Sequence, residues 1–112
     1  MKQFIPVFLF LFLSCRQPYP RVPAGVIPPA QMELVLSDMF IADALSQTRA
    51  LGGTNEKQYT LQYYTTIYKN YGISKEDFLK SYKFYEDNPV LLNRLYDEVL
   101  SEISKREAEA GK

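Results

Sequence analysis

Few side chains in this chain of 112 residues are of the types that carry out chemistry, and the carboxylates of Asp38 and Asp43 are the leading candidates. The chain has no histidine and a single cysteine, Cys15. A Ser-His-Asp triad and an ordinary zinc site, which need histidine or several thiolates, are therefore excluded. What remains is acid–base chemistry by a pair of carboxylates, in which Glu76 or Asp77 would supply the second acid.

The spacing of Asp38 and Asp43 argues against such a pair. The two residues are five positions apart, which places them roughly 140° apart around a helix and prevents them from meeting through local spacing alone. We therefore predict no catalytic residues, no metal site and no cofactor. Because a buried carboxylate needs a partner, each is expected to accept a hydrogen bond from a tyrosine hydroxyl or a helix amide.

Tyrosine is abundant, with nine residues, and several of them share one predicted helix. The plain interpretation is packing at the core and its margin, since phenol rings bury well and keep one polar end in water. The alternative is a stacking surface for sugar rings or for a partner protein. The candidate binding surface predicted from these patterns comprises Asp38, Asp43, Tyr63, Tyr64 and Tyr68.

The first predicted helix carries both aspartates and runs from Ala30 to about Leu51, after Pro28-Pro29 and before Gly52-Gly53. Its apolar residues recur at spacings of three and four, which is the period of one helix face. Phe40 falls outside this stripe, on the polar side with Glu33 and Ser37. The stripe consists of Met32, Val35, Leu36, Met39, Ala42 and Leu45.

Three further helices are predicted, so the fold class is all-α, a small bundle of about four helices. The second begins near Thr54 or Asn55, with Asn55 in a capping box, and ends at Tyr71 before Gly72. The third begins at Ser74, which forms a capping box with Asp77. The fourth begins at Asn88-Pro89, with Asn88 as the cap. The buried stripe of the third is Phe78, Leu79, Tyr82 and Tyr85, and that of the fourth is Leu92, Leu95, Tyr96, Val99 and Ile103.

The first fourteen residues predict a cleaved leader. Lys2 precedes a short apolar run that ends at Ser14-Cys15, and the run is shorter than the ~20 apolar residues that a membrane-crossing helix needs. The pattern resembles a bacterial lipobox, after which the mature chain starts at a lipidated Cys15. A leader cleaved to give a soluble product, and a retained anchor, are the alternatives. We expect a membrane attachment through the N-terminal lipid.

Composition divides the rest of the chain. Residues 15–29 are rich in proline and predict an extended tether of up to ~40 Å, with Val26-Ile27 docked on the core. Residues 30–104 form the helical domain, and residues 105–112 a charged, solvated tail. Lys plus Arg and Asp plus Glu balance at 13 each, which excludes a nucleic-acid partner. In the class of lipoproteins that the lipobox resembles, an acidic run after the cysteine marks display on the cell exterior. No such run follows Cys15, so a periplasm-facing location is expected, with the outer membrane as the expected membrane.

The order of several short motifs resembles one family, the small Bacteroidota lipoproteins called domain of unknown function 4296. The resemblance extends from Val26 to about Ile103 and implies a lipid-anchored helical domain on the periplasmic side, without an assigned activity. Relatives often carry histidine after the Asp38-Met39 pair and glutamate at position 43. Here the residues are Phe40 and Asp43, so a histidine–carboxylate metal site is not expected. The matching motifs are Val26-Ile27-Pro28-Pro29, Asp38-Met39, Ala42-Asp43-Ala44, Tyr71-Gly72-Ile73 and Asn88-Pro89.

The leading functional hypothesis is a non-enzymatic binding or scaffold module of the bacterial cell envelope. It would dock a protein or an envelope glycan through a tyrosine-rich groove bordered by Asp38 and Asp43. The first alternative is a carboxylate-dependent hydrolase of envelope glycans, which requires two acids converging in one pocket. The second is a purely structural spacer, which requires no exposed aromatic patch.

Overall fold

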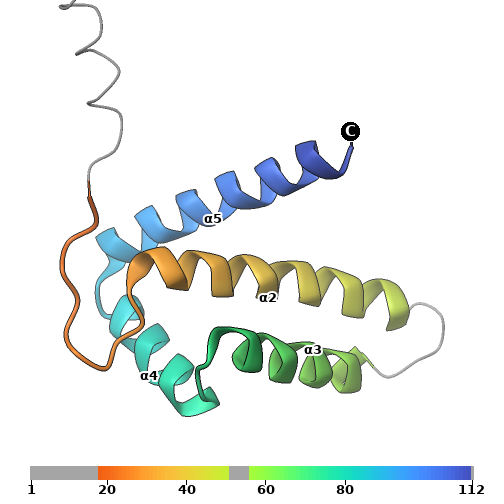
Figure 1. The fold of residues 1–112 in the computed structure, drawn as a ribbon, viewed down its shortest axis with the longest axis horizontal. Coiled ribbons are helices and arrows are strands. Elements are labelled where there is room, and N and C mark those ends of the chain that lie inside the picture. The colour runs from red at the N-terminus through yellow and green to blue at the C-terminus, as the bar shows by residue number, and fades with distance from the viewer. Residues whose placement is uncertain (1–17, 51–55, 112) are drawn as a thin grey trace, which may run out of the picture.

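The computed structural model of the chain describes residues 18–50 and 56–111, which form four helices joined by short connections (Figure 1). The helices are α2 (Pro29–Ala50), α3 (Glu56–Tyr71), α4 (Lys75–Glu86) and α5 (Pro89–Ala110). These residues contain no strand, and the predicted all-α bundle is confirmed. Four predictions concern residues outside the described ranges: the leader, the lipidation of Cys15, the helix stop at Gly52-Gly53 and the cap at Asn55.

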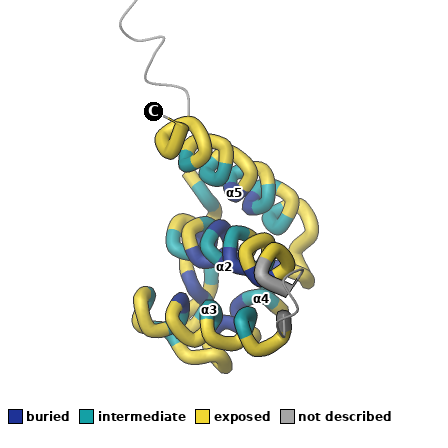
Figure 2. Tube along the Cα trace, turned by 90° about the vertical axis from the view of Figure 1, so that its right-hand side faces the viewer, coloured by how far each residue is buried: buried dark blue, intermediate teal, exposed yellow. Residues whose placement is uncertain are grey.

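Helix α2 lies between α3 and α5 and supplies more buried residues of the core than any other described helix (Figures 1 and 2). Its predicted stripe is buried from Met32 to Ala42, but Leu45 is 46 % exposed. Ser37, which was predicted on the polar side of this helix, is 0 % exposed, because α2 is contacted on two sides. The Phe40 ring, predicted on the same polar side, lies 6.1 Å from the Tyr96 ring of α5.

Helix α4 is short and connects the end of α3 to the start of α5 (Figure 1). Its predicted capping box is confirmed, since Ser74 Oγ accepts a hydrogen bond from the Asp77 amide at 3.0 Å and Asp77 Oδ2 accepts one from the Ser74 amide at 3.2 Å. Phe78 is buried, whereas Leu79 is 53 % exposed and does not belong to the buried stripe. Consecutive residues point about 100° apart on a helix, so the Phe78 and Leu79 side chains leave α4 in different directions.

Asn88 occupies the cap position of α5, but its side chain does not cap that helix. Instead, Asn88 Nδ2 donates a hydrogen bond to the Phe84 carbonyl at 2.7 Å. The predicted cap interaction is therefore wrong, and the side chain stabilises the end of α4. Pro89, as predicted, is the first residue of α5.

Residues 18–28, which we call the strap, contain no helix or strand but lie against the bundle. Ile27 is 6 % exposed, and its backbone is held from both sides. Its amide donates to Ser81 Oγ at 2.9 Å, and its carbonyl accepts from the Tyr85 hydroxyl at 2.5 Å. The predicted docking of Val26-Ile27 is therefore confirmed.

The first residues of the strap are held as well. Arg94 Nη1 donates to the Pro18 carbonyl at 3.3 Å, and the Arg94 guanidinium lies 4.3 Å from the centre of the Tyr19 ring. The Tyr19 hydroxyl donates to Glu33 of α2. Most of the segment predicted as an extended tether therefore lies along the helices from Pro18 onward.

Helix α5 continues to Ala110, beyond the predicted end of the helical domain at residue 104. Residues 105–110, predicted as part of a solvated tail, are therefore helical, and one of their side chains, Arg106, contacts α2. Among the described helices, none is both long enough and apolar enough to cross a membrane.

Candidate binding groove

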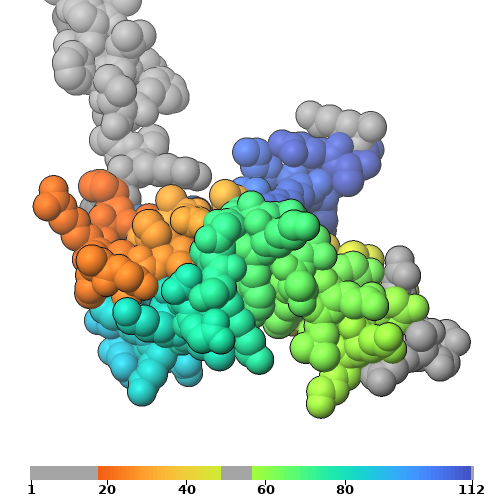
Figure 3. All heavy atoms as spheres, turned by 60° about the horizontal axis from the view of Figure 1, so that its bottom comes forward, coloured from red at the N-terminus to blue at the C-terminus, as the bar shows by residue number. Residues whose placement is uncertain are grey.

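An apolar groove runs between α3 and α4, on the face of the molecule shown in Figure 3. We call it the α3–α4 groove, and its volume is about 760 Å³. Two of its leucines, Leu61 and Leu79, are 56 % and 53 % exposed. Lys57 and Lys75 also line the groove, so ammonium groups lie beside the apolar surface. The remaining lining residues are Thr60, Tyr64, Thr65, Tyr68 and Phe78.

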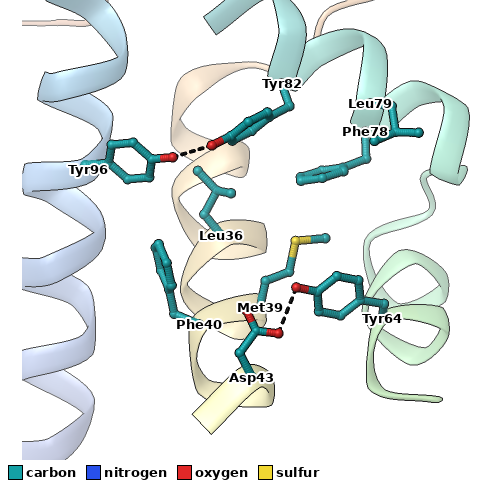
Figure 4. A pocket seen from close by; sticks show the side chains of 9 residues that line it. All are labelled: Leu36, Met39, Phe40, Asp43, Tyr64, Phe78, Leu79, Tyr82 and Tyr96. Atoms are coloured by element: carbon teal, nitrogen blue, oxygen red, sulfur yellow. Dashed lines mark hydrogen bonds between the residues drawn. The ribbon is translucent and has the colours of Figure 1, made fainter. Parts of the chain in front are cut away.

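A second hollow of about 330 Å³ adjoins this groove and reaches α2 and α5. The groove and the hollow share Tyr64, Phe78 and Leu79, so they form one continuous surface. Figure 4 shows the side chains that four helices direct toward this hollow. Its walls are mainly apolar and come from Leu36, Met39, Phe40, Phe78 and Leu79.

The polar groups of the hollow are paired with one another. The Tyr64 hydroxyl donates to Asp43 Oδ1 at 2.8 Å, and the Tyr82 and Tyr96 hydroxyls form a hydrogen bond between α4 and α5 (Figure 4). Burial, and then the hydrogen bond to Asp43, raises the pKa of Tyr64. Burial and the contact with Tyr82 raise the pKa of Tyr96 to about 12. Tyr64 and Tyr96 are therefore protonated at neutral pH, and Tyr64 acts as the donor to Asp43.

Asp38 lies in a separate network that joins three helices. Its Oδ2 accepts a hydrogen bond from the Tyr71 hydroxyl of α3 at 2.7 Å, and its Oδ1 lies 2.5 Å from Arg106 Nη1 of α5. Arg106 Nε also contacts Glu102 Oε1 at 3.1 Å. The hydrogen bond to Asp38 raises the pKa of Arg106, whereas burial, followed by the Asp38 contact, raises that of Tyr71.

The predicted binding residues are divided between two places. Asp43, Tyr64 and Tyr68 line the continuous surface described above. Asp38 and Tyr63 instead line a smaller hollow of about 210 Å³ between α2, α3 and Arg106. Each aspartate was predicted to accept a hydrogen bond from a tyrosine hydroxyl or a helix amide, and in both cases the donor is a tyrosine hydroxyl. The angular separation of the two aspartates explains why their environments differ.

Sequence reasoning missed two residues at these sites. It assigned Leu79 to the buried stripe of the third helix and placed Arg106 in a solvated tail. A local indication existed for Leu79, because Phe78 and Leu79 are consecutive and point about 100° apart on a helix. No local pattern indicated Arg106, whose partner Asp38 is distant in the sequence.

The tyrosines of α3 do not form an open aromatic platform. Tyr59, Tyr63, Tyr64, Tyr68 and Tyr71 are all half-buried, and Tyr68 packs edge-on to Tyr64, with ring centres 6.4 Å apart. The packing interpretation therefore describes these rings better than the stacking interpretation. Within the described ranges, no three His, Cys, Asp or Glu side chains gather into a set that could hold a metal ion.

The described residues define an all-α protein, in which a central helix is covered by two others and a fourth closes one end (Figure 1). A model of the family described as "Domain of unknown function (DUF4296)" matches residues 23–109, so the chain belongs to this family. The family resemblance identified from the sequence, to domain of unknown function 4296, is thereby confirmed, and the match includes part of the strap as well as the helices. No curated protein and no solved structure matches the chain.

Proposed function

We propose that this protein is a lipid-anchored binding module of the bacterial cell envelope, which holds a polypeptide segment in the α3–α4 groove. The single observation that carries the binding role is the exposure of Leu61 and Leu79 inside a groove of about 760 Å³. Exposed apolar side chains gathered in a concave surface are typical of recognition sites rather than of ordinary protein surface.

The chemistry of the groove favours a polypeptide over a glycan. Sugar rings need flat, open aromatic faces, whereas the tyrosines here are half-buried and their neighbours are leucines. Leucine side chains and the Phe78 ring fit apolar side chains of a helix or an extended segment. Lys57 and Lys75 add positive charge beside the groove. The partner segment is therefore one with apolar anchors flanked by Asp or Glu.

Site-specific photo-crosslinking in living cells tests this binding role. A photoreactive amino acid at Leu61 or Leu79 is expected to give a discrete adduct whose mass and peptides identify an acidic, apolar segment. The matched control is Leu100 on α5, which is 62 % exposed and lies outside the groove. Adducts at all three leucines, or at none, would contradict the proposal, and an adduct with a carbohydrate mass would favour the glycan alternative.

Charge reversal tests the predicted acidity of the partner. Lys57→Glu combined with Lys75→Glu is expected to remove the adduct at Leu79, because like charges now face the partner's carboxylates. Lys105→Glu, on the exposed face of α5, is the control and should leave the adduct intact. If the partner crosslinks equally well to the variant with both lysines replaced by glutamate, the partner segment is not acidic.

The paired-carboxylate hydrolase has no such support. Its two candidate acids lie in different hollows, and each is engaged by a partner, Arg106 and Tyr71 for Asp38 and Tyr64 for Asp43. The structural-spacer alternative would leave the exposed Leu61 and Leu79 without a role. Binding therefore accounts for more of the observed surface than either alternative.

Lipid attachment rests on the leader and is tested separately. Labelled palmitate should enter the wild-type protein but not Cys15→Ser, and only the wild type should sediment with membranes. Acyl chains contribute ~0.8 kcal/mol per buried CH₂, so two or more chains make attachment stable. Labelling of Cys15→Ser at the wild-type level would overturn this part of the proposal.

A further inference from the structure

The strap determines how far the bundle can move from its lipid. Pro18 and Tyr19 are held by Arg94 of α5 and by Glu33 of α2, and Ile27 is held by Ser81 and Tyr85 of α4. Both ends of the strap are thus attached to the helices. In the sequence, only Arg16 and Gln17 lie between the proposed lipid attachment at Cys15 and Pro18.

This connection is short. Cys15 and Pro18 are three positions apart, and a fully extended chain spans at most about 3.6 Å per residue, or about 11 Å in all. The tether of ~40 Å that was predicted for residues 15–29 would let the domain tumble freely. A connection of about 11 Å holds one particular end of the bundle close to the lipid headgroups.

The end that is held close is the corner between α4 and α5, next to the start of the strap (Figure 1). Pro20 and Arg21 of the strap border a shallow hollow of about 490 Å³ with Val90, Leu91 and Arg94. Val90 is 86 % exposed, more than any other large apolar side chain of the described residues. Arg21, Arg94 and Asp87 are the charged residues among those that line this hollow, and the Arg94 guanidinium also lies over the Tyr19 ring.

We propose that this corner, formed by Pro20, Arg21, Val90 and Leu91, is the membrane-facing surface of the protein and contacts anionic lipid headgroups. The inference rests on the proposed lipidation of Cys15, and its occupant is the bilayer to which the chain itself is anchored. Val90 and Leu91 supply apolar side chains at headgroup depth, and Arg21 supplies positive charge. The end of α2 and the end of α5 lie at the opposite end of the bundle (Figure 1). They therefore project away from the membrane.

Quenching by labelled lipids tests the orientation. The full chain, processed in a bacterial host, is placed in vesicles of phosphatidylethanolamine and phosphatidylglycerol that contain a lipid with a nitroxide at its headgroup. A fluorescent label is attached to Val90→Cys or, as the control, to Ala108→Cys, an exposed position on the same helix. The two positions are about 27 Å apart along α5. Quenching is expected to be severalfold stronger at position 90, and equal quenching at both would overturn the inference.

A second variant tests the role of the strap. Arg94→Ala removes the hold on Pro18 and Tyr19, so quenching at position 90 should fall toward the level of the Ala108→Cys control. Circular dichroism of the same sample verifies that the helices persist. If quenching at position 90 is unchanged in this folded variant, the strap does not set the orientation, and the inference fails.

Thiol labelling of the wild-type chain distinguishes a failure of the proposed orientation from a failure of the proposed lipid anchor. Its only cysteine is Cys15, and a lipidated sulfur does not take up a thiol label. A wild-type chain that is labelled shows that the lipidation has failed. A wild-type chain that stays unlabelled and bound to vesicles, with equal quenching at the two introduced cysteines, shows that only the orientation has failed.

Discussion

Arg106 is the side chain whose role differs most from its sequence context. It lies in a run of charged residues near the end of the chain, yet it forms an ion pair with Asp38 of α2. The side chains of Arg106 and Asp38 are 31 % and 26 % exposed, so the pair is partly shielded from water. With Tyr71 on the other oxygen of Asp38, the contact joins α5, α2 and α3 at one point.

Arg106→Ala is expected to lower the free energy of unfolding by about 1 kcal/mol, since it removes a partly exposed ion pair and leaves Asp38 with Tyr71 alone. Urea unfolding followed by circular dichroism measures the change. The effect should shrink as salt is added, because ions screen the pair. Lys105→Ala, an exposed neighbour on the same helix, is the control. A double-mutant cycle with Asp38→Asn that gives no coupling energy would contradict the assigned role.

The strap is the element whose attachment most affects the bundle as a whole, because it covers ends of α2, α4 and α5. The strap is attached at Ile27 through the fully buried Tyr85, whose hydroxyl donates a hydrogen bond to the Ile27 carbonyl. A strap released from Tyr85 would open more often without unfolding the helices, since local opening and global unfolding are separate events.

Tyr85→Phe should therefore speed tryptic cleavage after the exposed Arg21, about fivefold for a loss of about 1 kcal/mol in the opening free energy. The rate of appearance of the fragment that begins at Val22 is the measurement. Tyr63→Phe, a half-buried tyrosine of α3, provides the matched control. Cleavage at the same rate in both variants would mean that the hydroxyl does not hold the strap.

The molecule as a whole carries an unusual number of tyrosines whose ionisation is suppressed by folding. Burial raises the pKa of Tyr85 to about 12, and burial with the Tyr82 contact raises that of Tyr96 to about 12. Burial also raises the pKa of four other tyrosines, Tyr19, Tyr64, Tyr68 and Tyr71. In the unfolded chain all of these phenols titrate near pH ~10.

Stability should therefore decrease as the pH rises from ~10 to ~12, since the unfolded chain loses phenolic protons before the folded chain does. Below pH ~10 both states keep these protons, and the contribution is fully present. Urea midpoints across this range measure the effect. Tyr85→Phe with Tyr96→Phe should flatten the decrease, while lysine titration affects both proteins alike. A midpoint that rises with pH, or an identical slope in the double variant, would contradict the assignment.

The α3–α4 groove and the corner that is proposed to face the membrane occupy different parts of the same bundle. The groove opens between α3 and α4, whereas the corner lies where α4 meets α5 beside the strap. An anchored molecule oriented by its corner would leave Leu61 and Leu79 accessible to a partner within the envelope. The two proposals are thus compatible, and each can fail without the other.

Local rules were sufficient for the helices. The Ser74 capping box, Pro89 at the start of α5 and the apolar period from Met32 to Ala42 are confirmed, because caps and helix faces depend on residues within one or two turns of each other. The hydrogen bonds of both aspartates to tyrosines were also predictable, since a buried carboxylate requires a donor. The sequence by itself therefore determined the all-α class, the places where two helices begin, and the kind of partner that Asp38 and Asp43 need.

Only the tertiary structure decided which faces meet. Burial of Ser37, exposure of Leu79, attachment of the strap from Pro18 and the pairing of Arg106 with Asp38 all depend on residues that are far apart in the chain. A neighbouring helix can cover the polar face of a helix or leave its apolar face exposed. Neither outcome changes the spacing of apolar residues along the sequence of that helix. The physical reason is that capping and periodicity are properties of one helix, whereas the groove, the strap and the ion pair arise from the packing of several.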